Sequence, residues 1–169
     1  MRSLARPLTL VVALISLVLL THTERAEANG PAGEDLGAGI ILGEPTGLTG
    51  KYWFDSSSAV DVHLSFDFSD DAFALISDYL LHFNVFTPDS RSIDLPVYVG
   101  IGGKFFVRED NNDRGDDDDL GLGLRAPVGL SLLLTQAPLE FFVEIALGLR
   151  IIPGTEADLD GGIGVRYYF

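Results

Sequence analysis

The chain ends on a stretch with a strict two-residue period, GGIGVRYYF at positions 161–169. Successive side chains of a β-strand point to opposite faces, so every second residue of such a stretch shares a face. The apolar and aromatic side chains that share one face are Ile163, Val165, Tyr167 and Phe169. The other face holds glycines, Arg166 and Tyr168. This stretch predicts a β-strand with one apolar face and one face of small or polar groups.

Seven further segments repeat this period, and clusters of Gly, Pro, Ser, Asp and Asn separate them. The eight predicted strands are 36–43, 47–55, 59–69, 72–86, 95–108, 120–135, 139–151 and 161–169. Most reach the ~9–11 residues that a tilted strand needs to cross the hydrocarbon layer of a membrane. Eight is also the smallest common strand number of transmembrane barrels. We therefore predict an all-β fold, an eight-stranded antiparallel up-and-down transmembrane β-barrel.

Two segments fit this scheme less well. Residues 69–83 also have an apolar spacing that suits an amphipathic helix, capped by Ser69 or Asp70. A strand is needed there, because seven strands would leave the two chain ends on opposite sides of a membrane. Pro127 lies inside the sixth predicted strand and has no N–H to donate, so we expect the loss of one ladder hydrogen bond without a break in the strand.

Alternation alone does not say which face points outward. A soluble ligand-binding barrel of the lipocalin type has the same period with its apolar face inward. Here the polar face is rich in glycine, which is a poor choice for a water-exposed strand but suits a narrow interior where small residues must alternate with large ones. We therefore predict that the apolar faces point outward.

Charged residues gather on the same polar face. Six of the eight basic residues that follow position 28 lie there, together with five acids. Buried charges persist only when they are paired and hydrogen-bonded, and eight strands enclose a space just wide enough for side chains to fill. We predict an ion-pair network that closes the lumen and excludes an open, porin-like channel. Its predicted members are Lys51, Asp61, Asp67, Asp78, Lys104, Arg108, Arg125, Glu140, Glu144, Arg150 and Arg166.

The amino-terminal end has the pattern of an export signal. Arg2 and Arg6 precede an uncharged run from Pro7 to Leu20, and Ala26-Glu27-Ala28 supplies the small-x-small cleavage pattern. The run is shorter than the roughly 20 apolar residues of a transmembrane helix, so an uncleaved anchor is the weaker alternative. We predict a signal peptide at 1–28, cleaved near Ala28, and a single barrel domain at 29–169.

Composition excludes several kinds of chemistry. The chain has no cysteine, which removes disulfides, thiolate metal sites and cysteine catalysis. Residues 29–169 hold 8 basic and 23 acidic residues, a net charge of −15. Nucleic acid is therefore a poor partner. We expect no cofactor.

With a periplasmic start of the mature chain, strand parity puts the turns at 44–46, 69–71, 109–119 and 152–160 on the cell exterior. Residues 109–119 carry seven acids and one arginine. We expect a solvated acidic loop, and loose Ca²⁺ or Mg²⁺ binding at a lipopolysaccharide-rich surface is the alternative. It is not an EF-hand, because Arg114 and Gly121 would occupy ligand positions. The candidate cation ligands are Asp110, Asp113, Asp116, Asp117, Asp118 and Asp119.

Four stretches, 39–54, 95–103, 125–130 and 161–169, resemble a family of small bacterial outer-membrane barrels of unknown function, similar in architecture to OmpA and OmpX. The final Phe169, with Tyr167 two residues earlier, also resembles the signal that the barrel-assembly machinery reads. The resemblance implies the outer membrane of a Gram-negative-type envelope as the location. It implies membrane lipid, lipopolysaccharide and that machinery as partners, and it supplies no catalytic residues.

One group of side chains has catalytic types. His63, Ser65 and Asp78 are similar to the arrangement of barrel-type lipid A deacylases, in which a histidine activates a hydroxyl for acyl transfer. Leu64 holds the lipid-facing position between the first two, which departs from an enzyme that works on lipid. The alternative is that His63 and His82 belong to the interior network.

Aromatic residues near the strand ends predict interfacial girdles. They are Tyr52, Trp53, Phe54, Tyr79, Phe83, Phe86, Tyr167 and Phe169. Together these patterns predict a non-enzymatic outer-membrane barrel with a filled lumen, serving envelope integrity or surface interaction through acidic loops. A lipid A-modifying enzyme or a narrow small-solute channel is the alternative function.

Overall fold

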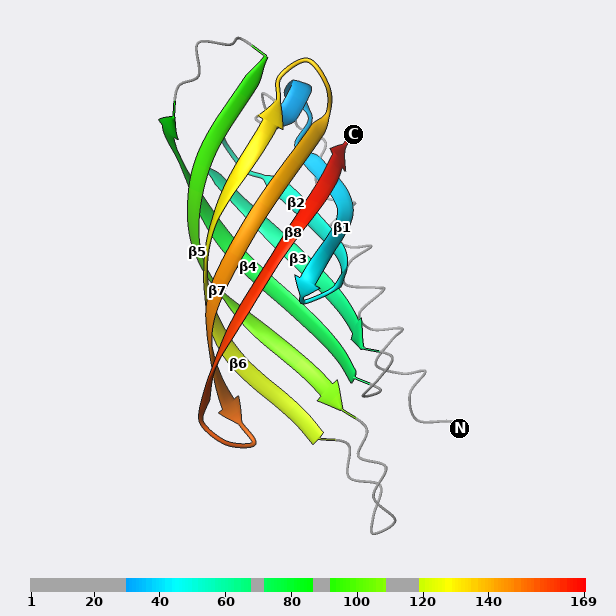
Figure 1. Cartoon of the computed structure of the whole chain (residues 1–169), viewed down its shortest axis with the longest axis vertical. Coiled ribbons are helices and arrows are strands. Elements are labelled where there is room, and N and C mark those ends of the chain that lie inside the picture. Colours follow the sequence, from blue (N-terminus) through cyan, green and yellow to red (C-terminus); the bar gives the residue numbers. More distant parts are fainter. Residues whose placement is uncertain (1–29, 68–71, 87–91, 109–118) are drawn as a thin grey trace.

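In the computed structural model, eight antiparallel strands form one closed barrel (Figure 1). The structure describes residues 30–67, 72–86, 92–108 and 119–169. Each strand pairs with the next, and β8 pairs with β1 to close the ring. The predicted eight-stranded antiparallel barrel is thus confirmed. The strands are β1 (Leu36–Glu44), β2 (Gly47–Trp53), β3 (Ser58–Asp67), β4 (Ala72–Phe86), β5 (Ile93–Arg108), β6 (Asp119–Leu134), β7 (Leu139–Ile152) and β8 (Glu156–Tyr168).

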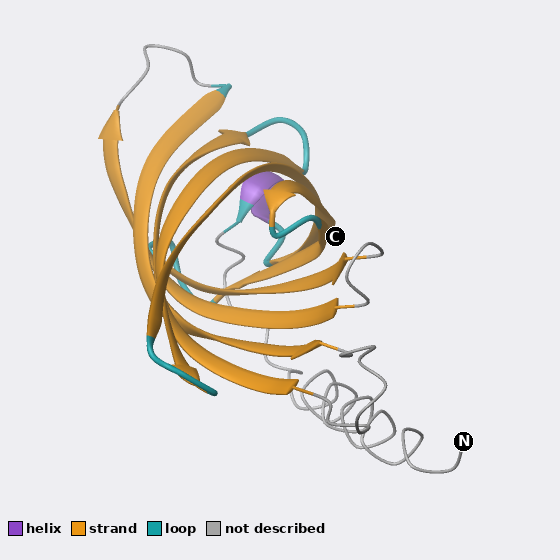
Figure 2. Cartoon of the chain, turned by 60° about the horizontal axis from the view of Figure 1, so that its bottom comes forward, coloured by secondary structure: helices purple, strands orange, loops and turns teal. Residues whose placement is uncertain are grey.

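The two ends of the barrel differ. A short 3-10 turn, η1 (Pro31–Gly33), lies within the ring of strands at the end where β8 finishes (Figure 2), with Pro31 buried. We call this end the terminal mouth. The turn at 153–155, between β7 and β8, lies at the opposite end, which we call the distal mouth. In the part of the chain that is described, no helix has the length and apolar character needed to cross a membrane.

One expectation about the strands is confirmed and one is wrong. The segment 72–86 is a strand, as predicted, and it pairs with β3 over 72–81 and with β5 over 72–86, so the helix alternative fails. The predicted turn at 152–160 is much shorter, because β8 begins at Glu156. Residues 156–160, EADLD, alternate acids with apolar residues, and the density of acids is typical of a loop. Their acids instead continue the inward face of β8.

The turn between β2 and β3 explains why β2 ends at Trp53 and not at Asp55. The Asp55 carboxylate accepts hydrogen bonds from the backbone N–H groups of Ser57 and Ser58, both at 2.8 Å, and from both serine hydroxyls. These bonds, with that of the Ser58 hydroxyl foremost, hold the pKa of Asp55 below its ordinary value. The side chain therefore serves the turn, and the chain leaves the sheet there.

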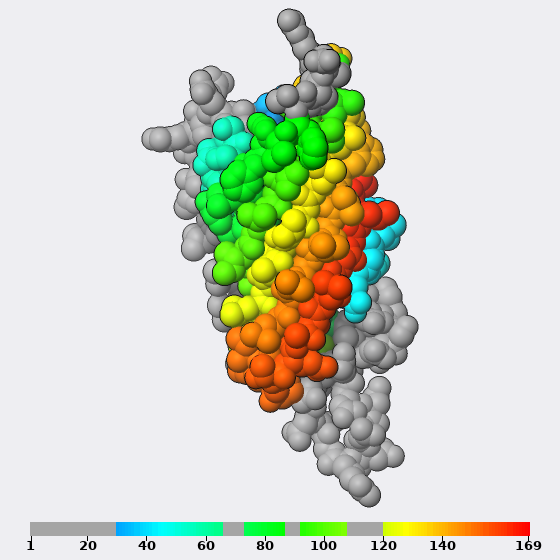
Figure 3. Space-filling model, turned by 60° about the vertical axis from the view of Figure 1, so that its left-hand side comes forward, coloured from blue at the N-terminus to red at the C-terminus, as the bar shows by residue number. Residues whose placement is uncertain are grey.

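Apolar side chains cover the outside of the barrel. On β7, Ile145 is 60% exposed and Leu147 68%, whereas the intervening Ala146 is buried. The neighbouring strands lie side by side as tilted bands on the surface (Figure 3), so the apolar faces are continuous from strand to strand. Pro127 lies within β6 opposite Ala146 of β7, and the pairing of the two strands continues on both sides of this position.

Trp53 does not belong to an interfacial girdle, and this prediction is wrong. It is 2% exposed and packs inside the barrel with Ala59, Leu133 and Tyr168. Its indole Nε1 donates to the Tyr168 hydroxyl at 3.1 Å. The alternation of β2 gives the reason, since Trp53 shares the inward face of Lys51. Six of the other predicted girdle residues are at least 46% exposed on the outer surface. They are Phe54, Tyr79, Phe83, Phe86, Tyr167 and Phe169.

Interior glycines face large inward rings on the next strand. Four such directly paired positions are Gly37 with Tyr168, Gly121 with Phe106, Gly129 with Tyr98, and Gly164 with Phe142. A Cβ at any of the four would come within 3 Å of the facing ring. Glycine thus gives each ring its space, as the alternation of small and large residues requires in a narrow barrel.

Gly129→Ala tests this packing. The new Cβ would lie 2.2 Å from Cζ of Tyr98, so we expect a loss of about 1–3 kcal/mol in the free energy of unfolding, typical of overpacking. Gly50→Ala is the matched control, because the nearest atom to its Cβ is 3.7 Å away. Urea unfolding of the refolded barrel, followed by fluorescence of the single tryptophan, measures both. Equal stability of the two variants would contradict the packing role of Gly129.

A charged cluster inside the barrel as the candidate functional site

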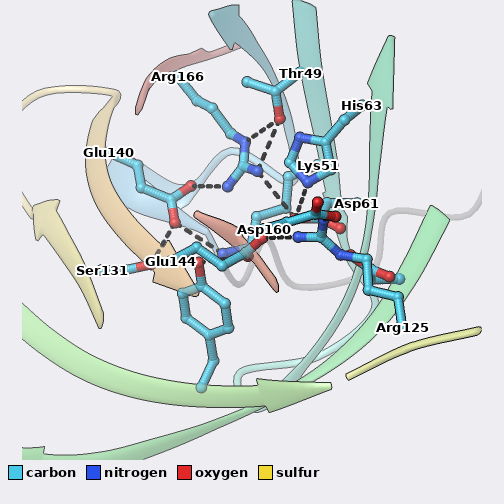
Figure 4. Close-up of polar contacts among 12 residues, drawn as sticks. Thr49, Lys51, Asp61, His63, Arg125, Ser131, Glu140, Glu144, Asp160 and Arg166 are labelled. Carbon is cyan, nitrogen blue, oxygen red and sulfur yellow. Dashed lines mark hydrogen bonds and ion pairs between the residues drawn. The ribbon is translucent and has the colours of Figure 1, made fainter. Parts of the chain in front are cut away.

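The barrel interior holds a group of buried charged side chains (Figure 4). They are Lys51, Asp61, His63, Asp78, His82, Arg125, Glu140, Glu144, Asp160 and Arg166. They come from six strands, β2, β3, β4, β6, β7 and β8, and each lies on the inward phase of its strand. We call them the lumen cluster. Its ion pairs are organised around one carboxylate and two guanidinium groups.

Glu140, on β7, is the acceptor around which the part nearer the terminal mouth is built. Lys51 Nζ lies 2.8 Å from its Oε1, and the Ser131 hydroxyl donates to the same oxygen at 2.6 Å. Arg166 NH1 and the Tyr168 hydroxyl approach Oε2 at 3.3 and 2.5 Å. Four donors from β2, β6 and β8 therefore satisfy a carboxylate that has no contact with solvent.

Arg166, on β8, connects this carboxylate to the opposite side of the barrel. Its NH2 donates to Asp61 Oδ2 at 3.0 Å, and its Nε and NH2 donate to the Thr49 hydroxyl at 3.0 and 2.8 Å. The guanidinium carbon also lies 3.9 Å from the centre of the Phe142 ring. One side chain thus links β8 with β2, β3 and β7.

Arg125, on β6, organises the part nearer the distal mouth. Its Nε donates to Asp78 Oδ2 at 2.8 Å, its NH1 to Asp160 Oδ2 at 3.1 Å, and its NH2 to Glu144. The acids belong to β4, β8 and β7. Since β4 and β8 are not neighbours of β6 in the sheet, these bonds cross the lumen. Lys104 Nζ reaches Asp160 at 3.0 Å from β5.

The remaining predicted network residues lie nearer the distal mouth or outside the described residues. Arg150 is paired with Glu156, whose side chain is 65% exposed. Asp67 and Arg108 belong to β3 and β5, but their side chains lie outside the described part of the chain. The predicted signal peptide and Asp110, Asp113, Asp116, Asp117 and Asp118 also lie outside it, and only the backbone of Asp119 is described.

Sequence reasoning missed three polar residues of the interior. Tyr98 donates to Glu144 Oε2 at 2.8 Å, and Thr49 and Asp160 bind Arg166 and Arg125. The signal was present in the phase, because each of these residues is an even number of positions from a predicted inward residue of its strand.

The structure does not assemble the acyl-transfer arrangement suggested by His63, Ser65 and Asp78. That chemistry needs a hydrogen bond between the histidine base and the hydroxyl nucleophile. Among the described residues, neither ring nitrogen of His63 has a hydrogen-bond partner, and the ring is fully buried. The carboxylate beside it is that of Asp61, with Oδ2 3.4 Å from Nε2.

Comparison with known proteins supports the fold. No protein-family model matches the chain, and no curated protein matches it. The N-terminal β-barrel domain of Pseudomonas aeruginosa OprF is similar in structure, with a TM-score of 0.60 and 16% sequence identity over 80% of this chain and 96% of that one. Neisserial surface protein A (NspA) gives a TM-score of 0.42 and 15% identity over 80% and 94% of the two chains. The chain has the fold of the OprF barrel.

Glu140→Ala tests the energetic role of the lumen cluster. The substitution leaves Lys51 and Arg166 buried without their shared partner, and breaking a buried ion pair costs about 3–5 kcal/mol. Glu156→Ala is the control, because its pair with Arg150 is largely exposed and such pairs contribute about 0–1 kcal/mol. A urea series on gels that separate the folded from the unfolded band measures both. Similar midpoints would show that the cluster contributes little to stability.

Proposed function

We propose that this protein is a non-enzymatic outer-membrane barrel of a Gram-negative-type envelope. In this proposal its lumen is closed by side chains, and it serves envelope integrity or surface interaction through acidic groups at the distal mouth. The observation that carries the proposal is the inverted distribution of polarity, with apolar side chains on the outer surface and ion pairs in the interior.

The outer surface favours hydrocarbon over water. Large apolar side chains that are more than a third exposed occur on all eight strands, whereas a soluble monomer rarely exposes a continuous apolar patch beyond a few hundred Å². Burying such area is favourable by about 25 cal/mol per Å², so an acyl-chain environment suits this surface. Closure of the sheet also leaves no unpaired strand edge, which a lipid environment requires.

The interior argues against conduction. Arg125 contacts acids on three other strands and Arg166 does so on two, so charged groups cross the lumen at two levels. An eight-stranded barrel has no spare cross-section around such side chains. Solute flow would require several of these pairs to separate together.

The distal mouth supports a role at the surface. Glu156 and Asp158 expose 65% and 41% of their side chains there, and β5 ends and β6 begins at the same end. The acidic segment 109–119 joins those two strands. With this mouth outward, carboxylates would meet the lipopolysaccharide layer, where Ca²⁺ or Mg²⁺ could link them to its phosphates. The barrel-assembly machinery would insert the chain.

Planar-bilayer recording tests the closed lumen. We expect the purified, refolded protein to give no steady conductance, because the ion pairs of the lumen leave no water-filled path. A sixteen-stranded porin, reconstituted in the same way, is the positive control. Steady large conductance that appears only with the folded protein would refute a filled lumen and favour the channel alternative.

A further inference from the structure

The ion pairs of the lumen leave some buried polar atoms without a hydrogen-bond partner. Among the described residues these atoms are Oδ1 of Asp61, Oδ1 of Asp78, both ring nitrogens of His63 and Nδ1 of His82. A buried polar atom without a partner is costly, so the lumen favours a ligand that can bind several of these atoms together.

Three of these ligand atoms mark where a cation would bind. Oδ1 of Asp61 and Nδ1 of His63 are buried without a hydrogen-bond partner among the described residues, and the contact of His63 Nε2 with Asp61 Oδ2, at 3.4 Å, is too long to count as a good hydrogen bond. Both side chains are fully buried. One ligand atom from each of Asp61, His63 and Glu144 lies within 4.8 Å of the other two. A buried polar atom without a partner is costly, and binding an ion would remove that cost.

We propose that Asp61, His63 and Glu144 form a metal site for a divalent ion of the Zn²⁺ class. One imidazole and two carboxylates suit Zn²⁺ and neighbouring transition metals, whereas Ca²⁺ and Mg²⁺ prefer oxygen ligands alone. In tetrahedral geometry, bonds of about 2.0–2.2 Å place ligand atoms about 3.3–3.6 Å apart. The three ligand atoms lie within 4.8 Å of one another, so a contraction of up to about 1.5 Å would bring them to an ion.

The position of these residues gives the ion a structural role. Asp61 and His63 are two positions apart on the inward face of β3, and Glu144 lies on β7, which is not a neighbour of β3 in the sheet. The ion would tie two sides of the barrel together. The surrounding donors already orient the carboxylates, since Arg166 holds Asp61 and Tyr98 holds Glu144. The two nearby guanidinium groups limit the affinity by repulsion.

Zinc retention by histidine variants tests the site. The full mature chain is refolded in detergent with Zn²⁺, dialysed against metal-free buffer and analysed for zinc, as wild type, His63→Gln and His82→Gln. His82 is the matched control, because it is a buried histidine that contacts Lys51 Nζ at 2.9 Å and lies outside the three-residue group. The acidic segment 109–119 is the same in all three proteins.

We expect about one zinc ion per barrel in the wild type and in His82→Gln, and background zinc in His63→Gln. Zinc should also raise the temperature at which the folded gel band disappears, except in His63→Gln. Equal zinc content in all three proteins, or none in the wild type, would overturn the site. If His63→Gln does not fold, two other measurements decide. Asp61→Asn should retain only background zinc, and the Co²⁺-loaded wild type should show a visible absorption spectrum with an imidazole-and-carboxylate signature. Wild-type zinc content in Asp61→Asn, or a spectrum without that signature, would overturn the site.

Discussion

The alternation of side chains along a closed β-sheet is the constraint on which the rest of this structure depends. Because the sheet has no edge, each strand must place one face against its surroundings and the other in a space only wide enough for side chains. In this chain the large apolar residues take the outer face, and charges, glycines and a few rings take the inner one. The glycines opposite four of the inward rings and the arginines that reach across the lumen both follow from this confinement.

The fold could be predicted from the sequence because the signal is repeated eight times and each repeat supports the others. The strand at 72–86 shows the value of this redundancy, since its own pattern also suited a helix and only closure of the barrel favoured a strand. Strand boundaries were less predictable where charged residues lie inside a strand. The acids of 156–160 are typical of a loop, yet they extend β8 because Lys104 and Arg150 pair with Asp160 and Glu156 on the inner face of the barrel.

The interior was predictable only in part. Period and charge identify which residues face inward, but they cannot say which acid meets which base, because that depends on the register and the stagger of strands around the barrel. Glu144 illustrates the limit. It lies on β7, 81 residues after His63, and its approach to Asp61 and His63 on β3 follows no simple sequence pattern. At Trp53 the alternation was the better guide. Its residue type suggested a membrane interface, but the alternation along β2 places its side chain inside the barrel.

The unfolding free energies of Ile145→Arg and Ile151→Arg, measured for barrels refolded into lipid vesicles, test most directly that the apolar faces contact hydrocarbon. Both side chains point outward from β7, with Ile145 at mid-strand and Ile151 near its end. A lipid-facing surface predicts a loss of about 2–4 kcal/mol for Ile145→Arg and about 0–1 kcal/mol for Ile151→Arg. Equal small losses, with both variants folded in buffer without lipid or detergent, would contradict it.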